Sequence, residues 1–318
     1  MRILFALPIV LAAPVASADP IKIVTDIPPV HSVVSLVAGD RAEVSLLSEG
    51  ATDLHHFQLR PSQSRLLSEA DAVIWVGEDL TPWLERAIGS LAPDAVSLEL
   101  AEEREDEEGH DDHGDHDDHD DHDDHDDHDD HDDHDDHDDH DDHDDHGHED
   151  PHVWLDPNHM KEAIHDIGIA LGQLDPEGAA IYEANAEAAE KRLDDLIEEA
   201  KSILDPIADR PFIVSHDGYN LFASTFGLTV AGSILDMDAN AASVRTLSNL
   251  GATVEEGNAL CVFGEVGHDA KLVNRLVEKG ARLGDDLDPG GVTITPGPNL
   301  YDELILGLAK SLADCLGQ

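Results

Sequence analysis

The chain has 318 residues, which is long enough for two domains of ordinary size, each with its own hydrophobic core. It contains 72 acidic and 18 basic residues, for a formal net charge of -54, and 31 of the acids lie between Glu102 and Asp150. A protein this acidic lacks the basic surface that binding to a phosphate backbone requires, so we exclude nucleic acid as a partner.

Residues 1–18 predict a signal peptide. Met1-Arg2 precedes a short apolar run from Ile3 to Val15, and Ala16-Ser17-Ala18 follows. A basic start, an apolar core and an Ala-x-Ala ending are typical of a cleavable secretory signal, and the run is too short to span a bilayer comfortably. We expect cleavage after Ala18 and a soluble periplasmic protein, because no cysteine stands near the cleavage point to accept a lipid.

Residues 19–174 predict a first α/β lobe. Short apolar runs indicate buried strands, and the segments between them have helical spacing, with Pro29 and Pro61 near two helix starts. The expected strands are 21–25, 44–47, 73–76, 95–98 and 152–155, and the expected helices are 30–37, 62–70 and 158–174. Strands that alternate with helices indicate a parallel sheet with crossover helices.

A low-complexity segment, residues 102–150, interrupts this lobe. Histidine recurs at every third position from His110 to His146, with almost nothing but aspartate between. A segment without aliphatic residues cannot bury a core, so we expect a disordered loop. Imidazoles suit zinc, copper or nickel, and the aspartates attract divalent cations, which favours weak metal capture; a solvated acidic loop without a ligand is the alternative. A disordered array pays ordering entropy for each ion, so a specific site must lie in the foldable sequence.

Residues 175–205 predict a long linking helix, and residues 206–318 predict a second α/β lobe. Asp175-Pro176 is a strong helix start, and the residues behind it have high helix propensity as far as Leu204. In the second lobe the expected strands are 212–215, 228–231 and 259–263, and the expected helices are 219–225, 243–256, 270–278 and 300–316. The fold class is therefore α/β, with two Rossmann-like lobes of parallel-rich sheet flanked by helices and joined by one long rigid helix.

The chain has only two cysteines, Cys261 and Cys315. In an oxidising exported compartment a pair without other partners most simply forms one disulfide, which would tie the C-terminal helix to a strand of the same lobe. Two buried free thiols are the alternative.

Three histidines outside the repeat stand where a strand gives way to a loop or helix. His55 follows a turn, His152 opens the expected strand 152–155, and His216 follows the strand 212–215. Neutral imidazoles that converge from separate segments on a cleft between two lobes are the arrangement that a zinc site needs. His56 could compete with His55 as a ligand. We interpret the remaining four as surface or packing residues, with His31 the first exception to consider: His31, His159, His165 and His268.

The sequence resembles the metal-binding solute-binding proteins of ABC importers, and within them the zinc-specific ZnuA group. The resemblance is carried by Gly50-Ala51, His55 to Ser62, Ala72 to Gly77, His152 to Pro157, Ser215 to Tyr219 and Leu287 to Pro289. It implies a zinc site at His55, His152 and His216, a two-lobed fold with a linking helix, a disulfide between Cys261 and Cys315, and a His-rich loop beside the cleft. We therefore expect a monomeric binding protein, not an enzyme, that captures Zn²⁺ and delivers it to a membrane permease.

The fourth zinc ligand is open. Asp288 matches a carboxylate that binds metal in related proteins, and its charge would halve that of the ion, whereas water or His56 is the alternative. Asp288 could instead cap the turn that follows it. Three histidines favour zinc over manganese. A periplasmic zinc buffer or chaperone is the alternative function; a zinc hydrolase is a weaker one, because we find no His-Glu-x-x-His or other catalytic signature.

Overall fold

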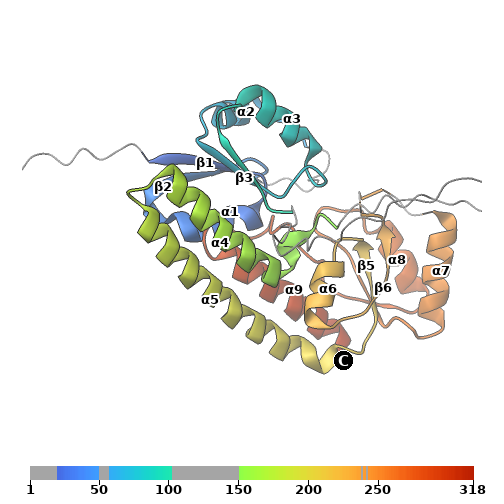
Figure 1. Cartoon of the computed structure of the whole chain (residues 1–318). Coiled ribbons are helices and arrows are strands. Elements are labelled where there is room, and N and C mark those ends of the chain that lie inside the picture. Colours follow the sequence, from blue (N-terminus) through green and yellow to red (C-terminus); the bar gives the residue numbers. More distant parts are fainter. Residues whose placement is uncertain (1–19, 50–56, 102–149, 238, 241–242) are drawn as a thin grey trace, which may run out of the picture. The chain divides into compact units, whose positions relative to one another are not determined.

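Two four-stranded parallel sheets organise the residues that this computed structural model describes, which are 20–49, 57–101, 150–237, 239–240 and 243–318. The first sheet has the order β2-β1-β3-β4 and the second the order β6-β5-β7-β8 (Figure 1). Their strands are Ile21–Thr25 (β1), Ala42–Leu46 (β2), Ala72–Trp75 (β3), Val96–Glu99 (β4), Phe212–His216 (β5), Val230–Leu235 (β6), Cys261–Phe263 (β7) and Arg282–Leu283 (β8). Every strand pairing is parallel, which confirms the predicted α/β class.

The crossovers between strands are helical. In the described part of the chain the α-helices are Pro28–Ala38 (α1), Pro61–Ser68 (α2), Pro82–Leu91 (α3), Pro157–Leu174 (α4), Ala179–Leu204 (α5), Asn220–Phe226 (α6), Val244–Glu255 (α7), Lys271–Glu278 (α8) and Leu300–Leu316 (α9). Helices α1 to α4 each begin with a proline, whose fixed φ suits the first helical position and whose missing N–H is not needed there. None of these helices is both long and apolar enough to cross a membrane.

Alternation along the strands divides the apolar side chains between layers. In β3, Ile74 belongs to the main core, whereas Val73 and Trp75 belong to a smaller core that includes Leu67 of α2 and Leu84 of α3. The second sheet repeats this division: Phe212 of β5 joins the main core, and Ile213 packs in a core with residues of α7 and α8. Each sheet therefore has helices of its own on one face, and both sheets contribute their other face to one main core.

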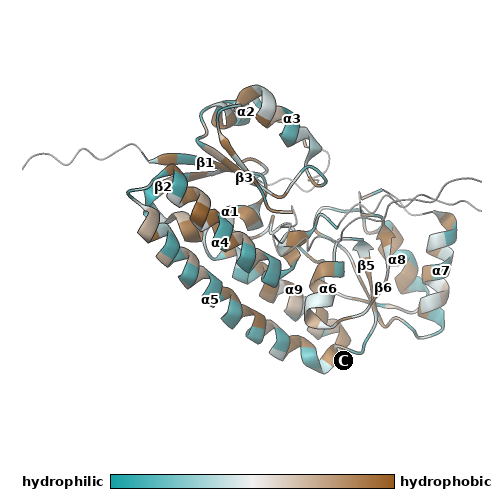
Figure 2. Cartoon of the chain, viewed as in Figure 1, coloured by the Kyte–Doolittle hydropathy of each residue, from teal (hydrophilic) through white to brown (hydrophobic). Residues whose placement is uncertain are grey.

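Helices α4, α5 and α9 fill the main core between the sheets. Much of the surface of α5 in view is hydrophilic (Figure 2), and its buried side chains, such as Leu193 and Leu196, pack in the core. Helix α9 contacts both α5 and α1 (Figure 1). Its first turn is fixed to α1 by a hydrogen bond from the Tyr301 N–H to Ser32 Oγ (3.1 Å), and its last turn is bonded to β7 by the Cys261–Cys315 disulfide. The disulfide is as predicted, and α9 provides a second connection between the two sheets beside α5.

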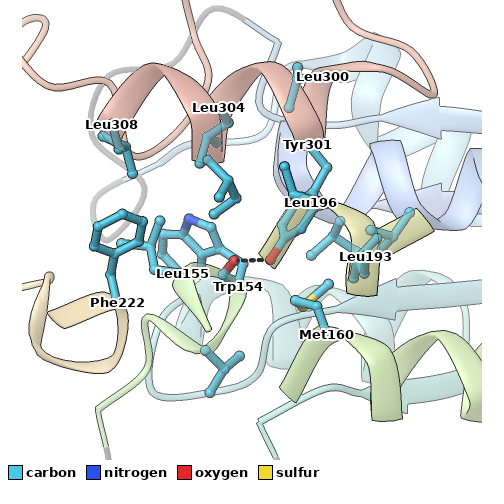
Figure 3. Packing of buried hydrophobic residues seen from close by; sticks show 14 of the residues in the cluster. Trp154, Leu155, Met160, Leu193, Leu196, Phe222, Leu300, Tyr301, Leu304 and Leu308 are labelled. Atoms are coloured by element: carbon cyan, nitrogen blue, oxygen red, sulfur yellow. Dashed lines mark hydrogen bonds between the residues drawn. The ribbon is translucent and has the colours of Figure 1, made fainter. Parts of the chain in front are cut away.

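The prediction of a strand at 152–155 was wrong, because Val153–Leu155 forms a 3-10 turn. The side chains of Val153, Trp154 and Leu155 are all buried, whereas a strand would send alternate side chains to opposite faces. The Trp154 indole N–H donates to the Pro289 carbonyl (2.8 Å), and the Tyr301 hydroxyl donates to the Trp154 carbonyl (2.8 Å; Figure 3). The turn is therefore held by the surrounding helices and loops and needs no strand partner.

Among the other differences from prediction, two elements were missed and the long helix begins later. The sequence did not predict α3, whose only buried side chain is Leu84, nor the two-residue strand β8. The long helix starts at Ala179 and not at Asp175, because Asp175 still donates its N–H to the Leu171 carbonyl at the end of α4 and residues 176–178 form a turn. The Asp175 carboxylate accepts hydrogen bonds from Arg41 and from the Tyr182 hydroxyl.

Candidate metal centre

Two of the predicted zinc ligands lie side by side. The ring centroids of His152 and His216 are 4.9 Å apart, and the planes are inclined at 72°. His152 precedes the buried 3-10 turn and is 2 % exposed, while His216 is the last residue of β5 and is 5 % exposed. Segments 64 residues apart in the sequence therefore bring two imidazoles together at the carboxyl end of the second sheet.

The third predicted ligand, His55, lies outside the described residues. The same holds for His56 and for the histidine repeat between Glu102 and Glu149. Within residues 20–49, 57–101 and 150–318, leaving out 238 and 241–242, no group of three or more histidine, cysteine or carboxylate side chains is placed to hold a metal ion.

A carboxylate fixes the orientation of His152. Asp150 Oδ1 lies 2.7 Å from His152 Nδ1 and also accepts the backbone N–H of His152 at 3.0 Å. A carboxylate at Nδ1 stabilises the tautomer that carries its proton there, so that the lone pair lies on Nε2. The backbone of Gly218 approaches this edge of the ring so closely that a Cβ at that position would lie 2.8 Å from Nε2.

His216 has a similar arrangement. Its Nδ1 lies 3.6 Å from Glu265 Oε2, and its Nε2 lies 3.0 Å from the carbonyl oxygen of Met237. Burial, the largest single effect, lowers the pKa of His216, but Glu265, the Met237 carbonyl and Asp217 together outweigh it and raise the pKa above 6.5. Protons therefore compete for this imidazole at a higher pH than for an ordinary histidine.

Sequence reasoning missed Glu265. This carboxylate follows β7 by two residues, is 9 % exposed, and accepts a hydrogen bond at Oε2 from the buried Tyr219 hydroxyl (3.0 Å). Burial and the Glu265 charge raise the pKa of Tyr219 well above 10, so the phenol stays protonated and remains a donor. The available signal was positional, because a carboxylate just beyond β7 must lie at the same sheet edge as His216, which ends the neighbouring strand β5.

Asp288 caps the loop that follows it. Its Oδ1 accepts the Val292 N–H (2.9 Å), and its Oδ2 accepts the N–H and hydroxyl of Thr293 (2.8 and 2.5 Å). The capping role considered from the sequence is thus present. The charge of Asp288 also reaches the Tyr219 phenol, whose pKa it helps to raise, and the Tyr219 hydroxyl donates to Glu265 beside His216.

The other described histidines take packing or surface positions, with one exception. His159 Nε2 contacts the Leu100 carbonyl (2.6 Å), and the largely exposed His165 lies 3.5 Å from Glu190. Burial of His31 in α1 lowers its pKa. His268, however, lies beside the pair, with its ring centroid 6.3 Å from that of His216.

The arrangement is suited to binding a soft or borderline divalent cation. Two buried imidazoles each have a carboxylate beside Nδ1, which is the usual way in which proteins orient metal-binding histidines. A third imidazole would complete the donor number of a zinc site with one position left for a further ligand.

Comparisons with known proteins also point to zinc. The family described as "Zinc-uptake complex component A periplasmic" (ZnuA) matches residues 23–315. The chain is 47 % identical over 311 residues to the high-affinity zinc uptake system protein ZnuA of Paracoccus denitrificans, covering 96 % of this chain and 95 % of that protein. It is 40 % identical over 306 residues to the protein of the same name from Brucella suis, covering 93 % and 92 %. A crystal structure of ZnuA superposes with a TM-score of 0.70 at 25 % identity, covering 94 % of this chain and all of that one, and a zinc-bound ZnuA deletion mutant gives the same TM-score and identity, covering 93 % and 98 %.

Proposed function

This chain belongs to the ZnuA family of periplasmic zinc-uptake components, and from that membership we propose that it captures Zn²⁺ with His55, His152 and His216 and delivers the ion to an ABC-type permease. The family is one of transport proteins and not of enzymes, and zinc is its ligand. The observation that carries the proposal is the buried pair of His152 and His216, each with a carboxylate beside Nδ1.

The donor set accounts for the choice of metal. Three neutral imidazoles at about 2.0–2.1 Å are a common set of protein ligands for zinc, whereas manganese prefers more oxygen donors. Asp150 lies beside the ring of His152 and Glu265 beside that of His216, so that each carboxylate orients an imidazole without binding the ion in this site. His216 exchanges its contact with the Met237 carbonyl for the metal when Nε2 becomes a ligand.

We propose Asp288 as the fourth ligand, through Oδ1. That oxygen accepts a single hydrogen bond, from Val292, and retains a second lone pair, while Oδ2 is held by Thr293. One carboxylate reduces the net charge of a zinc ion with three imidazoles from two to one, which lowers the cost of holding the ion in a partly buried site.

The accessory parts of the proposal concern segments outside the described residues. The histidine repeat, residues 110–148, collects zinc weakly, and the signal peptide is removed after Ala18 when the chain enters the periplasm. The mature protein acts as a monomer. Deleting 110–148 is expected to remove the weak sites and to leave one tight site.

The test is a chelator-competition zinc titration of the mature protein and of its His55→Ala, His152→Ala and His216→Ala variants. We expect one tight site in the parent and, in each variant, a loss larger than the roughly 10–100-fold that removal of a partner behind a ligand causes. His165→Ala is the matched control, because that imidazole is 58 % exposed on α4 and is paired with Glu190. Its affinity should equal that of the parent.

Two outcomes would contradict the proposal. A tight site that survives His152→Ala and His216→Ala would move the specific site elsewhere. If deletion of residues 110–148 abolished tight binding, the repeat itself would be the binding element. The protein would then be a zinc buffer.

A further inference from the structure

His268 occupies an unusual position at the edge of the histidine pair. It lies in the loop between β7 and α8, and its side chain is 22 % exposed, compared with 7 % for His216 and 9 % for Glu265. Its buried Nδ1 makes no hydrogen bond, and it faces Glu265 Oε1 at 3.8 Å. A partly exposed imidazole therefore lies beside His216, and its Nδ1 faces a carboxylate.

Glu265 presents one oxygen to each histidine. Its Oε2 accepts the Tyr219 hydroxyl and lies 3.6 Å from His216 Nδ1, whereas Oε1 lies on the side of His268. The peptide of residue 265 is fixed by a parallel bridge to Leu287, and the Val266 N–H donates to the Leu287 carbonyl (2.9 Å). The Glu265 carboxylate thus lies beside two imidazoles. We call that of His216 the inner imidazole and that of His268 the outer imidazole.

The outer imidazole is reached from a cavity. Ser215, Leu272, Gly267 and His268 are among the residues that line a half-open space of about 550 Å³ beside α8, which is large enough for a hydrated ion. Ser215 Oγ is buried, makes no hydrogen bond, and comes from the residue directly before His216. The cavity therefore extends from solvent to the strand that carries the inner imidazole.

The separation of the two outer donors suits a zinc ion. With bonds of about 2.0–2.2 Å, tetrahedral zinc places two of its donor atoms about 3.4 Å apart. His268 Nδ1 and Glu265 Oε1, at 3.8 Å, need only a small side-chain rotation to reach that separation. Two protein donors with water at the other positions bind more weakly than the full inner set, so an ion held there would exchange quickly.

We propose that His268 and Glu265 Oε1 form a second, transient zinc site through which the ion passes between the cavity and the inner site. The inference rests on the proposed function, since it presumes a tight site at His152 and His216. In this step the ion exchanges its waters for protein donors one at a time, and the outer imidazole is the first to bind on entry and the last to leave on release.

The experiment measures zinc exchange and zinc affinity separately, on the full mature chain loaded with one equivalent of Zn²⁺. Release is followed by stopped-flow mixing with excess 4-(2-pyridylazo)resorcinol, and the dissociation constant is obtained by equilibrium competition. For His268→Gln we expect entry and release both to slow about tenfold while the dissociation constant stays unchanged, because a group that binds only along the path lowers the barrier in both directions. His165→Gln is the control and should match the parent in both measurements.

A second variant separates metal binding from a structural role. His268→Asp keeps a zinc donor but places it beside Glu265, where it repels that carboxylate in the metal-free protein. Fast exchange in His268→Asp and slow exchange in His268→Gln would support a site that acts by binding zinc. Parental rates in His268→Gln, or a dissociation constant weakened along with the rates, would overturn it. A parent without any tight site would instead refute the proposed function.

Discussion

Asp26 makes the stability of this protein depend on pH in an unusual direction. It follows β1, is fully buried, and accepts the Ile27 N–H at Oδ1 (2.8 Å) and the Val76 N–H at Oδ2 (2.9 Å). Burial, which opposes ionisation, outweighs these two hydrogen bonds and raises its pKa from 3.8 to about 7. The carboxyl is thus largely neutral in the folded protein at pH 6, where the unfolded chain has it ionised.

The sign and size of the effect follow from that difference. A pKa raised on folding contributes stability that is complete below the unfolded value of 3.8 and is lost as the pH rises through about 7. About three pKa units correspond to about 4 kcal/mol in total, of which about 2.5 kcal/mol falls between about pH 5 and pH 8. Urea denaturation of the zinc-free protein across this range measures the free energy of unfolding directly.

The Asp26→Asn variant isolates this contribution. Asparagine cannot accept both backbone N–H groups, so the variant should be less stable throughout, but its free energy of unfolding should fall by about 2.5 kcal/mol less than that of the parent over the same pH range. Asp94→Asn, at an exposed position, serves as the control and should leave the parental slope. Equal slopes in the parent and in Asp26→Asn would show that the carboxyl is already ionised in the fold, and would refute the reasoning.

Three further predictions concern the disulfide, the main core and the candidate metal centre. Replacing Cys261 and Cys315 by serine should lower the free energy of unfolding by about 4 kcal/mol, from the closure entropy of residues 54 apart, and a loss under about 1 kcal/mol in urea denaturation would contradict this. Tyr301→Phe leaves a buried carbonyl without its donor and should cost about 1–3 kcal/mol by the same assay; an unchanged midpoint would show that another donor replaces the hydroxyl. Glu265→Gln removes the charge that raises the pKa of His216, so the zinc affinity of the variant should begin to fall at a lower pH than that of the parent. Chelator competition between about pH 5.5 and pH 8 measures this, and coincident pH profiles would exclude Glu265 as the cause.

Most of the fold could be predicted because its elements carry strong local signals. β1 and α9 have the predicted bounds, since an apolar run or a sustained helical period identifies each of them. The 3-10 turn at Val153–Leu155 could not be recognised, because a short apolar run does not reveal whether sheet or helices cover it. Only the contacts of Trp154 with Pro289 and Tyr301 decide that, and both partners are more than 130 residues away.

Two imidazoles of the candidate metal centre could be proposed from the sequence, whereas the groups beside them could not. His152 and His216 were chosen as histidines at the boundaries of predicted strands, and the structure places them side by side, although His152 precedes a 3-10 turn and not a strand. Glu265 is one of many acidic residues in this chain, and nothing local distinguishes it. Its role depends on the pairing of β5 with β7 and on the rotamer that turns one oxygen toward each histidine. For the same reason His268 was grouped with the surface histidines.

The position of α9 also governs when the protein can fold. The main core contains residues from Ile23 to Leu316, and the last helix packs against α1, which follows the first strand. Before α9 is in place, the faces of α1 and α5 that pack against it have no partner, so the main core is incomplete. Contacts between segments this far apart in the sequence slow folding, because the chain between them must first be brought together. The Cys261–Cys315 disulfide then fixes the last turn of α9 to β7 and lowers the conformational entropy of the unfolded chain.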